Sequence, residues 1–207
     1  MANCKPLLQQ MSATGPRLFL ASTSPRRKDL LNAHGYAFTV SSVAVEEIAD
    51  TALGPERLVR ENARLKAHSI KHLHSEGVIL AADTVVALGD RIFGKPADMQ
   101  DAASMLAELN GRAHVVHSGV CLLVATTLEE RIFVVSTTVR FHTLSQAQQA
   151  AYLLRIKPLD KAGAYAAQDD DGALIAGYEG SFSNVIGLPM EALALQLAEF
   201  GVHPQQP

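Results

Sequence analysis

The chain contains the stretch Leu18-Phe-Leu-Ala-Ser22-Thr23-Ser24-Pro25-Arg26-Arg27-Lys28, in which an apolar run leads directly into hydroxyl residues, a proline and three cations. The apolar run predicts a buried strand, Ser24 is a good helix N-cap, and Pro25 fits the first helical position. A strand that turns directly into a helix directs unpaired backbone N–H groups and the positive end of the helix dipole to one point. The stretch therefore predicts an anion site with phosphate as its ligand. The alternative is a well-capped helix whose cations face solvent.

Length and composition indicate an ordinary globular protein. The chain has 207 residues, of which 48% are hydrophobic and 19% are charged. This is enough for one sizeable α/β domain or two small lobes with a substantial core. The net charge of −3 argues against a binder of nucleic-acid polymers or of membrane surfaces, because no basic excess is present to neutralise many phosphates. The two cysteines, Cys4 and Cys121, give no disulfide framework, so a reducing compartment, the cytoplasm, is expected.

The domain organisation follows from the order of the patterns. Residues 1–16 lack the apolar core of a signal peptide and predict a flexible N-terminal leader. The longest apolar run, 120–125, is too short to span a membrane. Residues 17–207 predict a single domain in which strands and helices are mixed rather than strictly alternating. The expected fold is therefore α/β, with a mixed sheet and helices packed around it.

The expected elements can be placed by residue range. Helices are expected at 25–34, 55–74, 98–110, 145–155 and from 189 onward. Strands are expected at 18–21, 36–40, 78–81 with an extension through 85–88, 91–93 and 173–176. Two or three further strands are expected over 114–117, 120–125 and 132–141. Residues 158–171 are expected to form a loop.

Asp83 is the most informative carboxylate of the chain. It follows the apolar strand at 78–81, which would deliver its side chain to an edge of the sheet, where ligands often bind. An aspartate there can hold a divalent metal or deprotonate a water molecule. The alternative is a strand-end aspartate that accepts a hydrogen bond from a nearby backbone N–H.

Two further segments carry groups suited to a nucleotide. Gly89 to Lys95 has the spacing of a P-loop, but Pro96 stands where the hydroxyl residue should be, so a P-loop is rejected and Lys95 is expected to reach a phosphate as a point charge. Farther along, Gln168 carries an amide that could pair with the edge of a base, and Tyr165 is expected to anchor its loop. Cations for phosphates, acids for a metal and an amide for a base together predict a nucleoside triphosphate as the ligand.

The same stretches resemble the Maf family of nucleotide pyrophosphatases, in order, from about residue 18 to 195. The matching segments are Leu20-Ala-Ser-Thr-Ser-Pro-Arg-Arg27, Lys66-Ala67, Ala81-Ala-Asp-Thr84, Gly94-Lys-Pro96, Asp101-Ala102, Met105-Leu106, Leu109-Asn-Gly-Arg112, Ser118-Gly-Val120, Thr138-Val-Arg-Phe141, Asp160-Lys-Ala-Gly-Ala-Tyr165 and Val185-Ile-Gly-Leu-Pro189. The resemblance implies an elongated sheet in two lobes around a cleft, similar to inosine triphosphate pyrophosphatases. It also implies hydrolysis of a nucleoside triphosphate to the monophosphate and pyrophosphate with Mg²⁺, Mn²⁺ or Co²⁺, and a homodimer.

The resemblance also carries residue roles. In the dTTP/UTP branch of the family, three positions that set the substrate class hold the residues found here at Arg26, Thr84 and Gln168. The catalytic aspartate of the family falls on Asp83. The other active-site matches are Ser22, Arg26, Arg27, Glu47, Lys66 and Lys95.

Two departures from the family pattern concern acidic residues. The acidic loop of many members reads Asp-x-Asp-Glu, whereas this chain has Ala44-Val45-Glu46-Glu47, which leaves Glu46 and Glu47 as candidate metal ligands. After Gln168, where many members have glycine, Asp169-Asp-Asp171 follows, and a solvated turn into the next strand is expected.

The sequence thus predicts a metal-dependent pyrophosphatase acting on dTTP, UTP and modified pyrimidine triphosphates. Asp83 is expected to be the general base or a metal ligand together with Glu47, and the cations are expected to bind the triphosphate. The alternatives are a phosphatase that releases orthophosphate and a nucleotide-binding regulator of cell division without turnover.

Overall fold

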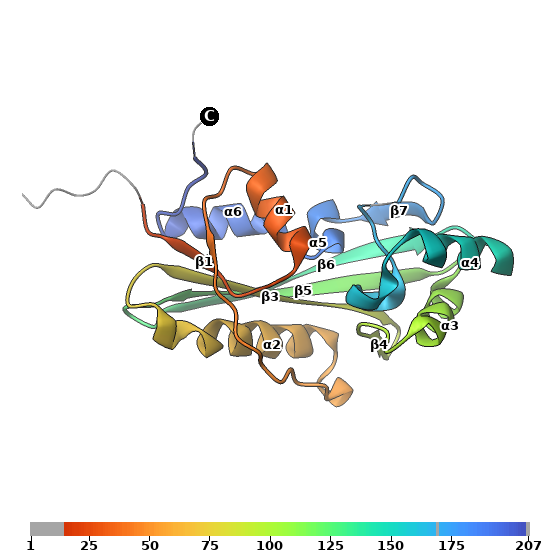
Figure 1. Cartoon of the computed structure of the whole chain (residues 1–207), viewed down its shortest axis with the longest axis horizontal. Helices are drawn as coiled ribbons and strands as arrows, with labels where there is room; N and C mark the ends of the chain where they lie inside the picture. The colour runs from red at the N-terminus through yellow and green to blue at the C-terminus, as the bar shows by residue number, and fades with distance from the viewer. Residues whose placement is uncertain (1–14, 169, 206–207) are drawn as a thin grey trace, which may run out of the picture.

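The computed structural model describes residues 15–168 and 170–205, which form one elongated mixed β-sheet with helices on both faces (Figure 1). The strand order is β2-β1-β3-β5-β6-β7, and β4 pairs with β3. Only the β1–β2 and β1–β3 pairs are parallel among the described strands. The strands are β1 Leu18–Leu20, β2 Thr39–Val40, β3 Val78–Leu88, β4 Arg91–Phe93, β5 Ala113–Val124, β6 Glu130–Phe141 and β7 Ile175–Glu179. The prediction of a mixed α/β sheet is confirmed.

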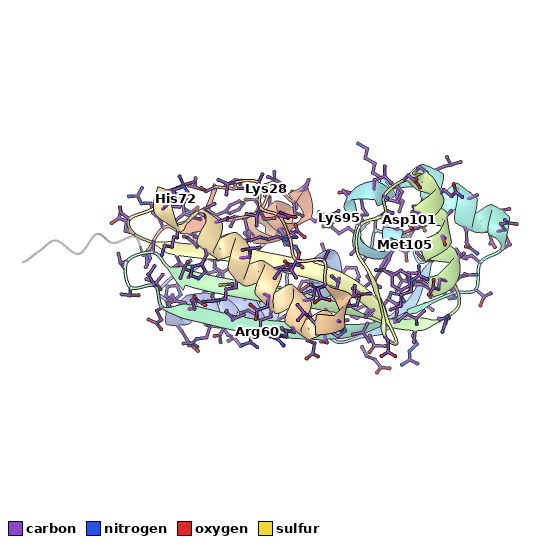
Figure 2. All side chains as sticks on the ribbon, turned by 90° about the horizontal axis from the view of Figure 1, so that it is seen from below. Lys28, Arg60, His72, Lys95, Asp101 and Met105 are labelled. Carbon is purple, nitrogen blue, oxygen red and sulfur yellow. The ribbon has the colours of Figure 1, made fainter. Side chains whose placement is uncertain are left out.

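The helices cover the sheet unevenly. In Figure 1, α2 covers one face, α1 and α6 lie on the other, and α3 and α4 gather at one end; Figure 2 places Lys95 between α2 and α3. The helices are α1 Pro25–Ala33, α2 Pro55–Ser69, α3 Met99–Leu109, α4 Gln146–Arg155, α5 Phe182–Ile186 and α6 Met190–Glu199, with 3-10 turns η1 Thr51–Leu53, η2 Lys71–Leu73, η3 Pro158–Asp160 and η4 Ala162–Ala164. No helix in the described ranges is long and apolar enough to cross a bilayer.

Several expected boundaries were wrong. The helix expected to reach residue 74 ends at Ser69 and is followed by η2, while the strand expected over 36–40 keeps only two residues. Of the two or three strands expected over 114–117, 120–125 and 132–141 there are two, because the first two segments form one strand, β5, that pairs continuously with β6. Most of the expected leader, residues 1–14, lies outside the described part of the chain.

The core explains the long apolar run of β3. Ile79 and Ala81 pack with Ala63 and Ala67 of α2. Leu80, which points to the opposite face, packs among side chains of α1 and α6. Because both faces are covered, the strand is apolar at successive positions rather than at alternate ones.

Gly119 of β5 allows α2 to approach the sheet. A Cβ atom at this position would lie 2.4 Å from the carbonyl oxygen of Val59 in α2. A side chain is therefore excluded, and the glycine keeps α2 close to the strand beside Asp83, which is the register partner of Gly119.

The middle of β3 has an open edge that positions the functional groups. β1 pairs with β3 only as far as Leu80, and β4 begins to pair with it at Val86. Asp83 and Thr84 lie between these two points. Since successive side chains of a strand alternate, Asp83 points to the α2 face and Thr84 to the face that carries α1 and α5.

Candidate active site

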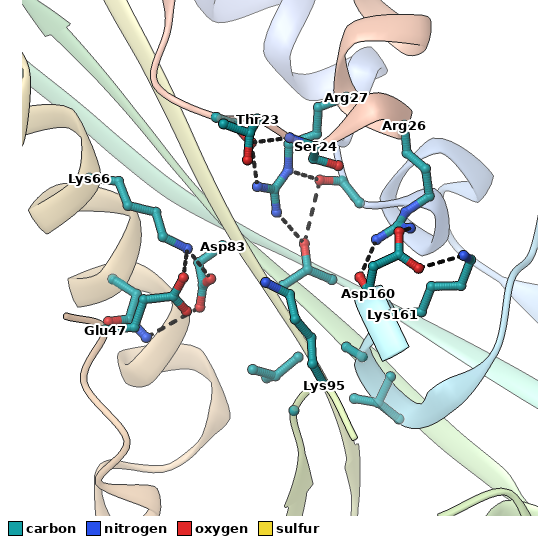
Figure 3. Close-up of a pocket in the computed structure, with 18 of the residues that line it drawn as sticks. Thr23, Ser24, Arg26, Arg27, Glu47, Lys66, Asp83, Lys95, Asp160 and Lys161 are labelled. Atoms are coloured by element: carbon teal, nitrogen blue, oxygen red, sulfur yellow. Dashed lines mark hydrogen bonds and ion pairs between the residues drawn. The ribbon is translucent and has the colours of Figure 1, made fainter. Parts of the chain in front are cut away.

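A cavity of about 1030 Å³ lies along this open stretch of β3. Its lining includes these residues predicted from the sequence: Ser22, Arg26, Arg27, Glu47, Lys66, Asp83, Thr84 and Lys95. Figure 3 shows Lys66, Asp83 and Glu47 on one side of the cavity, and Arg26, Asp160 and Lys161 on the other. Glu46 and Gln168 are exposed and do not line it, although Ala167, the neighbour of Gln168, does.

Lys66 joins the two carboxylates of the cavity. Its Nζ donates to Oδ1 of Asp83 at 2.6 Å and lies 3.0 Å from Oε1 of Glu47. Asp83 is only 6% exposed. Burial acts to raise the pKa of Glu47, but the attraction of Lys66, with Lys95 and Arg27, outweighs it and lowers the pKa. The cavity therefore holds an ionised Glu47 beside a cation and a buried aspartate.

Asn62 of α2 is part of the site and was missed by the sequence analysis. It is 2% exposed, and its Nδ2 donates to Oδ2 of Asp83 at 3.3 Å and to the carbonyl of Ile48 at 3.1 Å. Its Oδ1 accepts the Ile48 N–H at 2.8 Å. Asn62 thus fixes the segment that carries Glu47. The sequence feature that could have indicated Asn62 is its spacing from Lys66, because residues four positions apart lie on the same face of a helix.

Arg27 organises the floor of the cavity. Its guanidinium donates to the carbonyl of Gly187 at 2.9 Å and to the hydroxyl oxygens of Ser22 and Thr84, both at 3.2 Å. Burial lowers its pKa, and the attraction of Asp83 opposes this shift. Arginine stays charged in proteins, so Arg27 contributes a fixed positive charge.

The start of α1 differs from the expectation in one detail. The helix begins at Pro25 as predicted, but the Ser24 side chain makes no capping hydrogen bond. Ser22 takes over the local contacts instead: its Oγ accepts the Ser24 N–H at 3.2 Å. Ser24 thus occupies the N-cap position as predicted but makes no side-chain capping hydrogen bond, and both Ser22 and Ser24 line the cavity.

Arg26 reaches across the cavity to a residue that the sequence analysis gave no role. It donates to Oδ2 of Asp160 at 2.8 Å and to the carbonyl of the same residue at 3.0 Å. Lys95 behaves differently: it is exposed, and its Nζ has no hydrogen-bond or ion-pair partner among the residues that the structure describes. Lys95 can therefore meet an incoming anion without first breaking a hydrogen bond or ion pair to another described residue, whereas Arg26 and Lys66 are held in ion pairs and Arg27 in hydrogen bonds.

The segment near Gln168 is anchored as expected. Tyr165 is 6% exposed, its hydroxyl lies 3.1 Å from Nε2 of His114, and its ring packs edge-on against Phe141. The acidic side chains that follow Gln168 stabilise the turn that leads into β7. The Asp170 carboxylate accepts backbone N–H groups at the start of β7, and Asp171 pairs with an arginine of α4; Asp169 lies outside the described residues.

The donor set of the cavity fits a divalent metal in part. Asp83 and Glu47 offer two carboxylates that already surround one cation, Lys66. Within the described ranges no group of three or more His, Cys, Asp or Glu side chains is assembled. Mg²⁺ commonly takes one or two carboxylates and completes its shell with water and substrate phosphates. The site therefore suits an ion that arrives with a phosphate ligand.

Comparisons with known proteins identify the family of the chain. A family model described as Maf-like protein matches residues 17–200. The chain is 45% identical to the dTTP/UTP pyrophosphatase of Myxococcus xanthus, with 89% of this chain and 93% of that protein covered. It is 46% identical to the dTTP/UTP pyrophosphatase of Gloeobacter violaceus, with 89% and 96% covered, and 40% identical to that of Xanthomonas axonopodis pv. citri, with 90% and 100% covered. The chain belongs to the Maf family.

Proposed function

We propose that the protein is a nucleoside triphosphate pyrophosphatase that converts dTTP and UTP, and related modified pyrimidine triphosphates, to the monophosphate and pyrophosphate. The observation that carries this proposal is the cavity on β3, which places one buried carboxylate, Asp83, among the cations Arg26, Arg27, Lys66 and Lys95. The dTTP/UTP pyrophosphatase names of relatives that match about nine-tenths of the chain support it.

The reaction is the attack of water on the α-phosphorus. A new bond forms between the water oxygen and that phosphorus, and the bond to the oxygen bridging the α- and β-phosphates breaks, so pyrophosphate leaves. Asp83 accepts the proton of the water. Each of its carboxylate oxygens has one hydrogen bond within the protein and retains capacity for another. The cavity cations stabilise the charge that develops on the leaving pyrophosphate.

Asp83 and Glu47 are the residues that would hold a divalent ion such as Mg²⁺, Mn²⁺ or Co²⁺. When bound, the ion would neutralise phosphate charge and polarise the α-phosphate. The exposed Glu46 precedes Glu47 in the sequence and is a further candidate ligand.

Arg26, Thr84 and Gln168 are proposed to select the pyrimidine. Arg26 and Thr84 line the cavity, and Gln168 follows the lining residue Ala167. Replacing Gln168 by glutamate should reduce the preference for dTTP over GTP, since a carboxylate cannot donate the hydrogen bonds of an amide. An unchanged dTTP-to-GTP ratio would argue against a base-reading role.

The test is a panel of dTTP, UTP, CTP and GTP with Mg²⁺, with products separated by anion-exchange chromatography. Monophosphate and pyrophosphate in equal amounts are expected, with dTTP and UTP preferred. Diphosphate and orthophosphate would instead identify a phosphatase. Tight nucleotide binding without metal-stimulated hydrolysis would favour a regulator of cell division. The Asp83→Asn variant, run in parallel, guards against a contaminating activity.

The proposal also covers the binding partner, the cellular compartment and the oligomeric state of the enzyme. Its partner is the free nucleotide rather than a nucleic-acid polymer, its compartment is the cytoplasm, and the family resemblance favours a homodimer. Light scattering coupled to size-exclusion chromatography measures the subunit number directly.

A further inference from the structure

Arg26 and Asp160 meet across the cavity from distant parts of the chain. Arg26 belongs to the first turn of α1, whereas Asp160 ends η3, 134 residues later. The arginine contacts both the carboxylate and the backbone carbonyl of Asp160, at 2.8 and 3.0 Å. Figure 3 shows this pair on the side of the cavity opposite Asp83 and Lys66.

Asp160 is itself held in place by groups other than Arg26. Lys161, which is only 8% exposed, donates from Nζ to the other carboxylate oxygen of Asp160 at 2.7 Å and to the carbonyl of Lys157 at 2.7 Å. The N–H of Gly163 donates to the carbonyl of Gly94, next to Lys95, at 3.1 Å. The position of the carboxylate is thus set by its own loop, and Arg26 adapts to it.

The electrostatics agree with an ionised Asp160. Burial acts to raise its pKa, but the hydrogen bond from Lys161 and the charges of Arg26 and Lys161 outweigh this and lower it. The Arg26 side chain is 23% exposed and that of Asp160 is 52% exposed. Ion pairs with this exposure contribute little to folding stability, because solvent screens them. The effect of the pair on the orientation of the Arg26 guanidinium is therefore more important than its contribution to folding stability.

We propose that Asp160 is a positioning residue, which holds the Arg26 guanidinium at the cavity so that its remaining N–H groups meet the nucleotide already oriented. This rests on the proposed function. An arginine offers five N–H donors, and Asp160 engages two nitrogens, which leaves donors for a substrate. A free arginine would lose most of its rotamer freedom when the nucleotide binds, and fixing it beforehand removes that cost from binding.

The test begins with Asp160→Asn, and Asp160→Ala serves as a second variant. For UTP, kcat/KM should fall by about tenfold, the size of one lost charge-assisted hydrogen bond, mainly through a higher KM. Because the buried Lys161 loses its carboxylate partner in both variants, circular dichroism is used to verify that each protein is folded at the assay temperature. The matched control is Glu199→Gln. Glu199 pairs with Arg131 at 2.7 Å, its side chain is 53% exposed, and it does not line the cavity. This control should leave kcat/KM unchanged.

A double-mutant cycle with Arg26→Ala decides whether Asp160 acts through Arg26. Initial rates of pyrophosphate release at UTP concentrations far below KM give kcat/KM even for weakened variants. In the Arg26→Ala background, Asp160→Asn should cause no further loss. An equal loss in both backgrounds, or no loss in the wild-type background, would overturn the proposal.

A failure of the proposed function can be told apart from a failure of this inference. If the wild-type protein releases no pyrophosphate from UTP, the proposed function is wrong. UTP then stays intact during a binding measurement. The wild type, the two single variants Asp160→Asn and Arg26→Ala, and the double variant are compared by calorimetric titration with UTP and Mg²⁺. If Asp160→Asn weakens UTP binding in the wild-type background but not in the Arg26→Ala background, the positioning role is supported. An equal loss of affinity in both backgrounds, or no loss in the wild-type background, rejects it.

Discussion

Asp83 and Thr84 are neighbours on β3, yet their side chains point to opposite faces of the sheet and both line one cavity. This is possible because the edge of β3 is open between its pairing with β1 and its pairing with β4. Asp83 meets Lys66 and Asn62 of α2, whereas Thr84 meets Arg27 and Ser118. A ligand at this edge can therefore contact groups from both faces at once.

Replacing Asp83 by asparagine should lower kcat by about 10²- to 10⁴-fold, because the amide cannot take the proton of the attacking water. Steady-state hydrolysis of UTP measures the effect, and circular dichroism verifies the fold. Asp90→Asn, at the exposed turn between β3 and β4, is the control and should behave as wild type. Near-normal turnover by a folded Asp83→Asn protein would remove Asp83 from the chemistry.

Replacing Asn62 by alanine should affect both stability and activity. The change leaves the Ile48 backbone without its partners and should cost about 1–3 kcal/mol in the free energy of unfolding, measured in urea. Because the segment carrying Glu47 is released, kcat/KM should also fall. Asn110→Ala is a matched control: Asn110 bonds the N–H and carbonyl of Leu144 in the same way, away from the cavity. It should lose stability only, and equal activity losses in the two variants would contradict the site assignment of Asn62.

Replacing Lys95 by methionine should weaken triphosphate binding without changing stability. Its ammonium has no hydrogen-bond or ion-pair partner in the described ranges, so its removal breaks no such bond, while one cation is lost from the cavity. KM for UTP should rise by about tenfold, and its dependence on salt concentration should weaken. Lys71→Met, in η2 and outside the cavity lining, should change neither. A Lys95 variant with unchanged KM would exclude a phosphate contact.

His114 should make stability dependent on pH. Burial lowers its pKa from 6.5 to about 4. Between these two pH values His114 is therefore protonated in the unfolded chain and neutral in the folded protein. The free energy of unfolding should therefore decrease as the pH falls from about 6.5 to 4, by up to about 3 kcal/mol from this group. Urea unfolding across this range should show a shallower loss in His114→Gln than in wild type. The exposed His203→Gln should follow wild type; parallel curves for all three would refute the assignment.

Replacing Gly119 by alanine should destabilise the protein, because the new methyl group would press on the backbone of Val59 in α2. Overpacking of this kind costs about 1–3 kcal/mol, or more where backbone must move. Thermal unfolding compares it with Gly177→Ala on β7, where nothing lies within 4 Å of the added methyl. Similar unfolding temperatures for the two variants would show that α2 can shift freely.

Local chemistry made much of the fold predictable. Asp98 accepts the Asp101 N–H and Ser145 forms a capping box with Gln148, both as their spacing indicates. These contacts join residues three apart, so sequence alone describes them. Strand pairing is not local, so the sequence left open whether the segments on either side of Ser118 form one strand or two, and the continuous pairing with β6 makes them one.

The sequence by itself determined the strand–turn–helix unit at Leu18–Ala33, the mixed sheet, and a set of cations and acids suited to a triphosphate. The tertiary structure alone decided how they combine. Asn62 supports Asp83 because α2 packs on β3, and Asp160 holds Arg26 because η3 faces α1 across the open edge of the sheet. Both contacts join residues distant in sequence, and no periodicity or cap signal encodes such a distance. The strand-to-helix turn was predicted from its own residues, and its contact with Asp160 was set by the tertiary fold.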